Sequence, residues 1–289
     1  MILVTGARGF VGQSLMRQLA AEGYETTPYE GHVADVYALR EAMQTAETVI
    51  HLASAEFRGR VKELAITDLE GTRRVVEEAN RANLNHIIYL SRLDADPNSM
   101  FAVLRTKGQA ERLVRQSGIP ATIVRSATLF GRHDRFLNSL AGLAAWSWPF
   151  VWLPAGGHAL LQPLWVEDLA RVLVRLSDPL DLQGYRGQTF EVAGAERLRY
   201  EELMRQVLSA AGLSRRPLGV RMPLVRFLTN VYWGRLRRPP VTRFFLDRLA
   251  VPETIEMDSV VRQFGFAPSR LSDQISYLRQ GNLRWRLWG

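Results

Sequence analysis

The sequence predicts a doubly wound parallel α/β sheet with a smaller, discontinuous C-terminal lobe on the substrate side. Two observations support this fold class. In the first half, short β-branched runs alternate with longer helical patterns, which is typical of βαβ units. The chain also opens with a strand, a glycine-rich turn and an amphipathic helix, in the segment VTGARGFVGQSLMRQLAAEG.

The first half contains five expected strands and five expected helices. Between Tyr29 and Asp35 there is no room for a full crossover helix, so the second and third strands should join through a short loop and a brief helix. The expected strands are Ile2–Thr5, Glu25–Tyr29, Thr48–Ala53, His86–Ser91 and Ala121–Arg125. The expected helices are Gly12–Glu22, Tyr37–Gln44, Val61–Ala82, Ser99–Ser117 and Phe136–Ala145.

The second half is less regular, so we place the domain boundary near its start. Residues 1–155 are expected to form a dinucleotide-binding domain. Residues 156–289 should form mostly the C-terminal lobe, with some segments returning to the sheet. The expected elements there are strands at Leu160–Val166 and Gln188–Ala193 and helices at Glu167–Leu176, Tyr200–Ala211 and Leu271–Gln280.

Bulk composition excludes several classes of protein. The chain has 289 residues, of which 47% are hydrophobic and 23% charged, values typical of a globular protein. It contains no cysteine, which excludes disulfides and thiol nucleophiles. The apolar run Leu140–Leu153 is too short to span a bilayer and contains Pro149. The N-terminus lacks the pattern of a signal peptide, so we expect a cytoplasmic location.

The glycine turn at residues 6 to 12 favours a dinucleotide ligand in a Rossmann-type fold. Gly6 permits a tight turn, Gly9 lets a pyrophosphate approach the backbone, and Gly12 allows the helix to pack closely on the strand. The N-terminus of the helix then faces the anion. A glycine turn without a ligand is the alternative.

The residues that would choose between NAD and NADP conflict. Glu30 ends the second expected strand, where an acid would accept hydrogen bonds from the adenosine ribose and disfavour a 2′-phosphate. Arg8, inside the glycine turn, could instead pair with that phosphate. Each could also be a solvated loop charge, so the choice between NAD and NADP stays open.

Several motifs together resemble the extended and atypical short-chain dehydrogenase/reductases. They are TGARGFVG, Asp35-Val36 before a helix, VIHLAS, HIIYLS with Lys107 on the next helix, and TIVRSATLFG. Two later stretches, LPAGGHALLQPLWVEDLA and PPVTRFFLDRLAVPETIEMDSVVRQFGFAPSRLSDQISYL, resemble the branch that contains the dehydrogenase-like accessory subunit of respiratory complex I and its bacterial relatives.

The resemblance implies a set of residues that contact NAD(P)(H). In such proteins Asp35 and Val36 flank the adenine, Leu52 to Ser54 run beside the cofactor, and Lys107 holds the nicotinamide ribose. The complete expected set is Thr5, Gly6, Arg8, Gly9, Phe10, Val11, Gly12, Glu30, Asp35, Val36, Leu52, Ala53, Ser54, Ser91 and Lys107.

The same resemblance implies that the standard catalytic tyrosine is missing. Active members carry a tyrosine four residues before the lysine, where the ammonium lowers the phenol pKa and makes it an acid/base. Val103 stands at that position, and Ser91 is followed by Arg92 and Leu93, where active members carry hydroxyls. The resemblance therefore implies a protein that binds the dinucleotide without tyrosine-dependent catalysis.

Lys107 is an unusual residue for this chain. Among its 37 lysines and arginines, only Lys62 and Lys107 are lysines. A compact ammonium with three donors can contact two ribose hydroxyls, which would explain why a lysine stands here. The alternative is a surface lysine on an amphipathic helix.

Other polar residues give weaker indications. Asp134, in the turn RHDR after Gly131, is a weak candidate for an alternative proton donor, and a solvated charged turn is equally compatible with its position. No pair of histidines has metal-ligand spacing, so we expect no metal site.

One segment carries the whole charge imbalance. The formal net charge is +8, and nine arginines face one acid, Asp247, between Arg215 and Arg248. Aromatic residues accompany these arginines, and Trp285 and Trp288 lie near the end of the chain. Arginine with tryptophan favours an anionic membrane surface or a membrane complex, peripheral to the inner face of the membrane. A protein partner alone is the second possibility, and nucleic acid is the least favoured.

Three functions are compatible with these patterns. The first is an NAD(P)(H)-holding accessory or assembly subunit of a membrane complex, respiratory or other electron-transfer. The second is an active reductase or epimerase on an apolar or nucleotide-linked carbonyl. The third is a redox-sensing regulator that binds a soluble partner.

Overall fold

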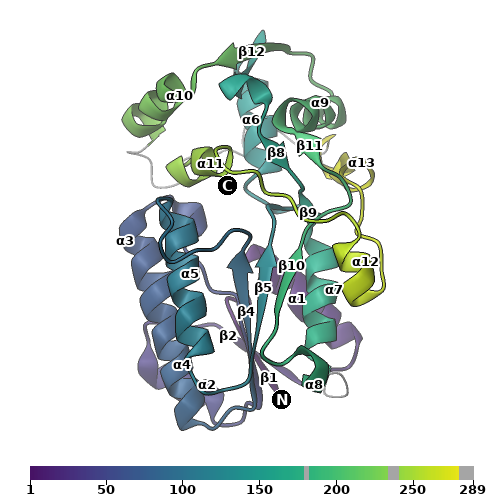
Figure 1. Ribbon diagram of the computed structural model, residues 1–289. Helices are drawn as coiled ribbons and strands as arrows, with labels where there is room; N and C mark the ends of the chain where they lie inside the picture. The colour runs from purple at the N-terminus through teal and green to yellow at the C-terminus, as the bar shows by residue number, and fades with distance from the viewer. Residues whose placement is uncertain (179–181, 234–240, 280–289) are drawn as a thin grey trace. The chain divides into compact units, whose positions relative to one another are not determined.

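The computed structural model describes residues 1–178, 182–233 and 241–279 (Figure 1). Their contacts divide the chain into two compact units. The first unit comprises Met1–Glu56, Arg60–Ser126 and Val166–Val192. The second comprises Phe57–Gly59, Ala127–Trp165 and Ala193–Gly289. Residues 127–155, which we expected in the dinucleotide-binding domain, thus cluster with the second unit, whereas residues 166–192 return to the first.

The first unit contains a six-stranded parallel sheet with the order β10-β5-β4-β3-β1-β2, which confirms the predicted fold class. The inner strands are buried along their length because helices cover both faces, and this is why their sequences are almost continuously apolar. The strands are β1 (Ile2–Thr5), β2 (Thr26–Tyr29), β3 (Thr48–His51), β4 (His86–Arg92), β5 (Ala121–Ser126) and β10 (Thr189–Val192).

The strand order fixes where a ligand can bind. The chain moves from β1 to β2 on one side and to β3 on the other, so the order reverses at β1. In open parallel sheets, ligands bind at the carboxyl ends of the strands beside this reversal. The short link predicted between β2 and β3 is present and contains only the brief helix α2 (Val36–Met43).

Helices pack on both faces of this sheet (Figure 1). α1 and α7 pack against each other, and Gln18 on α1 donates a 2.9 Å hydrogen bond to the carbonyl of Glu167 on α7. α2, α4 and α5 pack side by side in a second layer. The helices other than α2 are α1 (Phe10–Ala21), α3 (Val61–Leu64), α4 (Gly71–Arg81), α5 (Ala102–Arg115), α7 (Val166–Leu176) and α8 (Leu182–Tyr185).

One expected helix is divided. Residues 61–82 were predicted as a single helix, but a π-helical segment, η2 (Ala65–Glu70), separates α3 from α4. Such wide turns are rare and often occur at functional sites. Here the wide turn contains the buried acid Asp68, whose Oδ2 accepts a hydrogen bond from the backbone of Ala55.

The second unit is built around α6 (Leu137–Trp146) and α9 (Tyr200–Ala211), whose buried faces share one core.

The expected strand at residues 160–166 is two short strands, because Pro163 interrupts it. The expected C-terminal helix has one α-helical turn and continues as a 3₁₀ helix. The other elements are β6 (Leu129–Phe130), β7 (Phe150–Pro154), β8 (Leu160–Leu161), β9 (Leu164–Trp165), β11 (Leu198–Arg199), β12 (Arg216–Val220), α10 (Met222–Leu228), α11 (Arg243–Arg248), α12 (Ser259–Phe264) and α13 (Leu271–Gln274), with the short turns η1 (Glu56–Arg58), η3 (Ala155–Gly157), η4 (Thr229–Trp233) and η5 (Ile275–Arg279).

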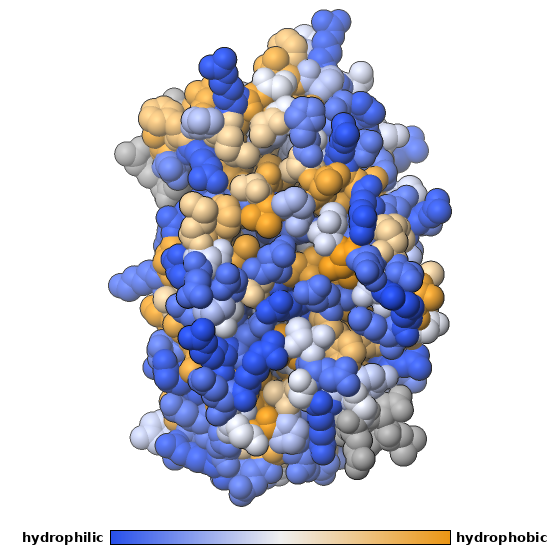
Figure 2. Space-filling model, viewed as in Figure 1, coloured by the Kyte–Doolittle hydropathy of each residue, from blue (hydrophilic) through white to orange (hydrophobic). Residues whose placement is uncertain are grey.

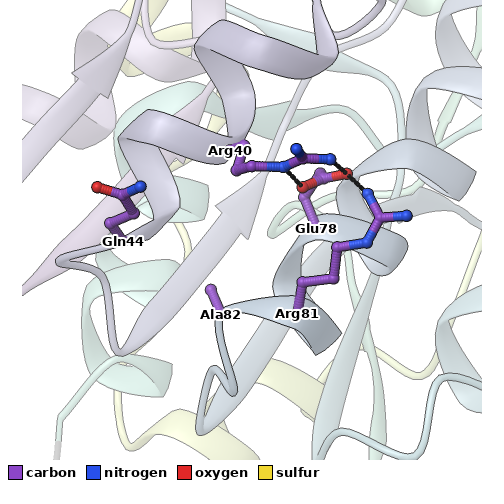
Figure 3. Close-up of a pocket in the computed structure, with 5 residues that line it drawn as sticks. All are labelled: Arg40, Gln44, Glu78, Arg81 and Ala82. Atoms are coloured by element: carbon purple, nitrogen blue, oxygen red, sulfur yellow. Dashed lines mark hydrogen bonds and ion pairs between the residues drawn. The ribbon is translucent and has the colours of Figure 1, made fainter.

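A charged cluster joins α2 to α4 in the first unit (Figure 3). Glu78 on α4 is buried, and its Oε2 accepts a 2.8 Å hydrogen bond from Nε of Arg40 on α2. Arg81 donates to the other carboxylate oxygen. The two arginines are about half exposed and cover the carboxylate beside a surface hollow that Gln44 and Ala82 also line.

We expect Glu78→Gln to lower the free energy of unfolding by about 1–3 kcal/mol at neutral pH, since it removes charge-assisted hydrogen bonds from a buried site. The bonds with Arg40 hold the pKa of Glu78 below its usual range, so this stabilisation is present above the unfolded pKa of about 4.3 and is lost as the pH falls through the folded value. Urea unfolding of both proteins at neutral and acidic pH measures the difference.

The matched control is Glu77→Gln, because Glu77 is the exposed neighbour of Glu78 on the same helix. It should change stability by less than about 0.5 kcal/mol. Equal effects of the two substitutions would contradict a stabilising role for the cluster.

Candidate dinucleotide site

The glycine turn has the geometry that its sequence predicts. Gly6 has a φ of 72°, and a Cβ there would lie 2.8 Å from the backbone nitrogen of Ala53. A Cβ on Gly12 would lie 2.3 Å from the carbonyl oxygen of Gly6. The turn therefore requires glycine at both positions, at one for conformation and at the other for close packing.

The first turn of α1 is available to an anion. Gly9 caps this helix without a side chain, and its own N–H donates to the carbonyl of Gly6 at 2.9 Å. The next N–H groups, those of Phe10, Val11 and Gly12, have no intrahelical acceptor because they begin the helix. This geometry fits a dinucleotide pyrophosphate, which these N–H groups would hold together with the dipole of α1.

The two residues with opposite cofactor preferences contact each other. Arg8 and Glu30 form an ion pair between the glycine turn and the end of β2, and both side chains are largely exposed. Each charge is thereby partly neutralised by the other. A 2′-phosphate that binds Arg8 must compete with Glu30, whereas a ribose that binds Glu30 must compete with Arg8.

The loops after β2 and β3 also lie at this edge of the sheet. Asp35 caps α2, since its Oδ1 accepts a hydrogen bond from Ala38 at 3.2 Å. Leu52 donates from its backbone to Thr5, and Ala53 contacts Gly6 across the missing Cβ. Val36, Leu52, Ala53 and Ser54 are all partly exposed. The structure thus brings the glycine turn and the Leu52–Ser54 segment together.

Lys107 is buried and paired. Its side chain is 5% exposed, and its Nζ lies 2.9 Å from Oδ1 of Asp68 and 3.4 Å from the carbonyl oxygen of Leu90. The alternative of a surface lysine is therefore wrong. Burial would lower the pKa of this ammonium, but the neighbouring Tyr89 and Asp68 outweigh that effect and raise the pKa above its usual value. The ammonium is thus paired within the protein, and its predicted contact with the nicotinamide ribose stays a prediction.

A chain of hydrogen bonds extends this pair across the strand ends. Thr72 donates to the carbonyl of Asp68, so its hydroxyl oxygen must accept from Nε2 of His51, 3.0 Å away. Nδ1 of His51 then accepts from the hydroxyl of Thr5 at 2.6 Å. Burial, and secondly the Lys107 charge, lower the pKa of His51 to about 3, so the ring stays neutral. The predicted cofactor residue Thr5 thus uses its hydroxyl within the fold.

The helical position one turn before Lys107 carries no phenol, and the phenol that lies beside the ammonium is that of Tyr89. Val103, one helical turn before the lysine, is buried and has no exchangeable proton. The ring of Tyr89 lies beneath the ammonium, with Nζ 5.3 Å from its centroid. Burial raises the pKa of Tyr89 to about 12 despite the lowering effect of Lys107, so this phenol stays protonated at neutral pH.

Ser91 is directed toward another cluster. Its hydroxyl is buried and donates to Oε1 of Glu111 at 2.6 Å. The carboxylate of Glu111 also accepts two hydrogen bonds from Arg125, from Nε at 2.9 Å and from Nη2 at 2.8 Å. In this structure the hydroxyl of Ser91 therefore connects β4 to α5.

Asp134 belongs to the second unit and is surrounded by internal donors. Its carboxylate accepts hydrogen bonds from the backbone of Gly131, Leu137 and Asn138, and from the hydroxyl of Tyr277 at 2.7 Å. Burial raises the pKa of Asp134 to about 6, although these bonds lower it. These contacts make Asp134 an anchor for the start of α6.

Sequence reasoning missed Asp68 as the partner of Lys107 and His51 as the link between Thr72 and Thr5. A signal for Asp68 was present in its spacing, because Leu64, Asp68 and Thr72 recur every four residues and all are buried. An acid on the inner face of a helical pattern needs a buried cation. Only Lys107 and Lys62 are lysines, and Lys62 is exposed.

Comparison with known proteins supports the prediction that the chain binds a dinucleotide. Residues 24–135 match the model of an NAD(P)H-binding family. The chain is 23% identical over 278 residues to mouse mitochondrial NADH dehydrogenase [ubiquinone] 1 alpha subcomplex subunit 9, covering 88% of this chain and 73% of that protein. It is 24% identical to the photosystem II assembly factor Ycf39 of Guillardia theta, covering 96% and 93% of the two chains.

A solved structure with the same fold is that of MoeE5 in complex with UDP-glucose and NAD. It superimposes with a TM-score of 0.74 at 18% identity, covering 96% of this chain and 98% of that chain. The chain thus carries an NAD(P)H-binding domain, and its resemblance to atypical short-chain dehydrogenase/reductases and to the complex I subunit is confirmed.

The buried ion pair predicts a large loss of stability when one partner is removed. Asp68→Ala or Lys107→Met should each lower the free energy of unfolding by about 3–5 kcal/mol, because each leaves an unpaired charge in the interior. The double variant should lose less than the sum of the two single losses. Chemical denaturation of the three variants measures these values, and the exposed Lys62→Met serves as the control. Additive losses would show that the two charges do not interact.

The Arg8–Glu30 pair predicts that each residue limits the other. Glu30→Ala should strengthen NADPH binding about tenfold or more, because Arg8 is released to pair with the 2′-phosphate. Arg8→Ala should weaken NADPH binding relative to NADH. Fluorescence titration with both cofactors measures the ratio, with Glu25→Ala at the other end of β2 as the control. Unchanged ratios in both variants would place the 2′-position away from this pair.

Proposed function

Because the chain carries an NAD(P)H-binding domain of the kind found in atypical short-chain dehydrogenase/reductases, we propose that it holds NAD(P)(H) without tyrosine-dependent hydride transfer. We propose further that it serves as an accessory or assembly subunit of a membrane complex. The bound dinucleotide stabilises the fold or reports redox state, and it is not turned over.

The proton chemistry around Lys107 is the observation that carries this proposal. Tyrosine-dependent transfer needs a phenol whose pKa a neighbouring ammonium brings near neutrality. At the position where the resemblance implies that phenol, the chain has the buried Val103, and the ammonium has Asp68 as its partner. The charge of Lys107 is therefore balanced within the protein and has no proton acceptor or donor to activate at that position.

The relatives support the accessory role. One is named as a subunit of NADH dehydrogenase, and another as an assembly factor of photosystem II. Within the part of the chain that the structure describes, no helix has the length and apolar character needed to cross a bilayer. Attachment through a surface, peripheral to the inner face of the membrane, is the arrangement that we propose.

The basic segment supplies charge for such attachment. Of its arginines, Arg226 forms a 3.0 Å ion pair with Asp247, the segment's one acid. Arg216 and Arg221 are exposed. Residues 234–240 and the expected contacts at Trp285 and Trp288 lie outside the described residues, so the proposal relies on the arginines before residue 230.

Two measurements test the function. Isolation from the native cell in mild detergent should recover the protein with subunits of a membrane complex and with retained nucleotide. Purified protein should bind reduced cofactor by fluorescence titration but should not oxidise it with a panel of carbonyl compounds. Turnover of the reduced cofactor with any of these carbonyl compounds would instead favour an active reductase or epimerase. Recovery only with a soluble partner, in a redox-dependent manner, would favour a regulator.

A further inference from the structure

A cluster of aromatic side chains is exposed on the second unit between α6 and the end of β7. Trp146 is 58% exposed and Trp148 is 75% exposed, while Phe150 and Trp152 are 41% and 42% exposed. We call these four residues the aromatic surface. The expected apolar run at residues 140–153 is thus partly core and partly surface, because Leu140, Ala141, Ala144, Val151 and Leu153 are buried in the core of this unit.

The strand pairing explains why these rings face outward. Along β7 the side chains alternate, so Val151 and Leu153 enter the core while Phe150 and Trp152 point away from it. β12 runs parallel to β7, with Arg216 in register with Phe150 and Leu218 in register with Trp152. The outer face of this two-stranded ribbon therefore combines aromatic, apolar and cationic side chains.

The neighbouring helix α10 continues the same character. Leu224 and Phe227 lie three residues apart on one face of α10 and are 52% and 62% exposed. Val225 on the opposite face packs into a small core together with Val220 at the end of β12. Figure 2 shows hydrophobic side chains gathered beside strongly hydrophilic ones over the region where Figure 1 places α10 and β12.

The segments that carry this surface contain arginines but no acid, and Asp247 of α11 pairs with Arg226 on α10. No acidic residue occurs between Asp134 and Glu167, or between Glu202 and Asp247. Arg215 is held by the 2.6 Å bond from its Nε to the carbonyl of Ala144, which leaves the exposed Arg216 and Arg221 as the cations beside the rings. A surface with exposed tryptophans and arginines is complementary to a lipid bilayer, whose interior is apolar and whose headgroups can be anionic.

We propose that the aromatic surface, with Arg216 and Arg221, binds an anionic phospholipid bilayer directly. The tryptophan rings sit at headgroup depth, and the two guanidinium groups pair with lipid phosphates. This inference deepens the proposed function. It takes from that function only the assumption that the protein works at a membrane. It names the side chains that contact lipid, whereas the accessory role concerns the protein partner.

Flotation with lipid vesicles tests this proposal on the full chain without any other protein. The wild type should bind vesicles of phosphatidylglycerol and phosphatidylcholine, bind pure phosphatidylcholine weakly, and shift its tryptophan emission to the blue on binding. Trp148→Ala/Trp152→Ala should reduce binding about tenfold or more, and Arg216→Gln/Arg221→Gln should reduce binding to the anionic vesicles alone. These side chains are exposed, so the variants should keep the circular dichroism spectrum of the wild type.

The matched control is Met100→Ala, an 83% exposed apolar residue on the first unit, which should bind like the wild type. Wild type that stays unbound with anionic vesicles at low salt would overturn the proposal. A tryptophan variant that binds lipid like the wild type would also overturn it. If that variant in addition no longer co-isolates with protein partners, the aromatic surface contacts protein and not lipid. Vesicle binding by a protein that co-isolates with no membrane complex would support the lipid surface and contradict the accessory role.

Discussion

The buried ion pair between Lys107 and Asp68 is the interaction on which the dinucleotide edge of the first unit depends. It joins α5 to the wide turn η2, and the second oxygen of Asp68 holds the loop after β3 through Ala55. The hydrogen bonds through Thr72 and His51 then reach the end of β1. A charge in the interior requires such a partner, because desolvating an unpaired ion costs several kcal/mol. The carboxylate that neutralises Lys107 thus also fixes the loop after β3, while the backbone of the same residue joins the hydrogen bonds that reach β1.

This requirement also explains how a dehydrogenase scaffold can keep its lysine without its tyrosine. With Asp68 present, the ammonium is neutralised inside the protein and does not depend on a phenol or a cofactor for its burial. The lysine therefore has a structural role whether or not it contacts a ribose. The lysine thus contributes to stability independently of any contribution to cofactor binding.

Much of the first unit could be predicted from the sequence because its signals are local. The apolar strands that alternate with helices, the glycine turn and the short link after β2 each depend on residues close together in the chain. The ion pairs Lys107–Asp68 and Arg8–Glu30 were missed because each joins residues far apart in the sequence, although the spacing around Asp68 gave a local signal for one member. The ribbon of β7 and β12 was missed for a related reason. Pro217 and Gly219 disfavour a strand in β12, and only pairing with β7 produces one.

The wide turn η2 places Asp68 by accommodating a local change in helical phase. A π-helical turn holds about one residue more than an α-helical turn, so the loss of one residue between Ala65 and Glu70 would allow a regular α-helix and shift Asp68 within it. The carboxylate would leave the strand ends, while the hydrophobic face of α4 would keep its place on the sheet. The electrostatic balance of the interior therefore depends on the length of this segment as much as on its composition.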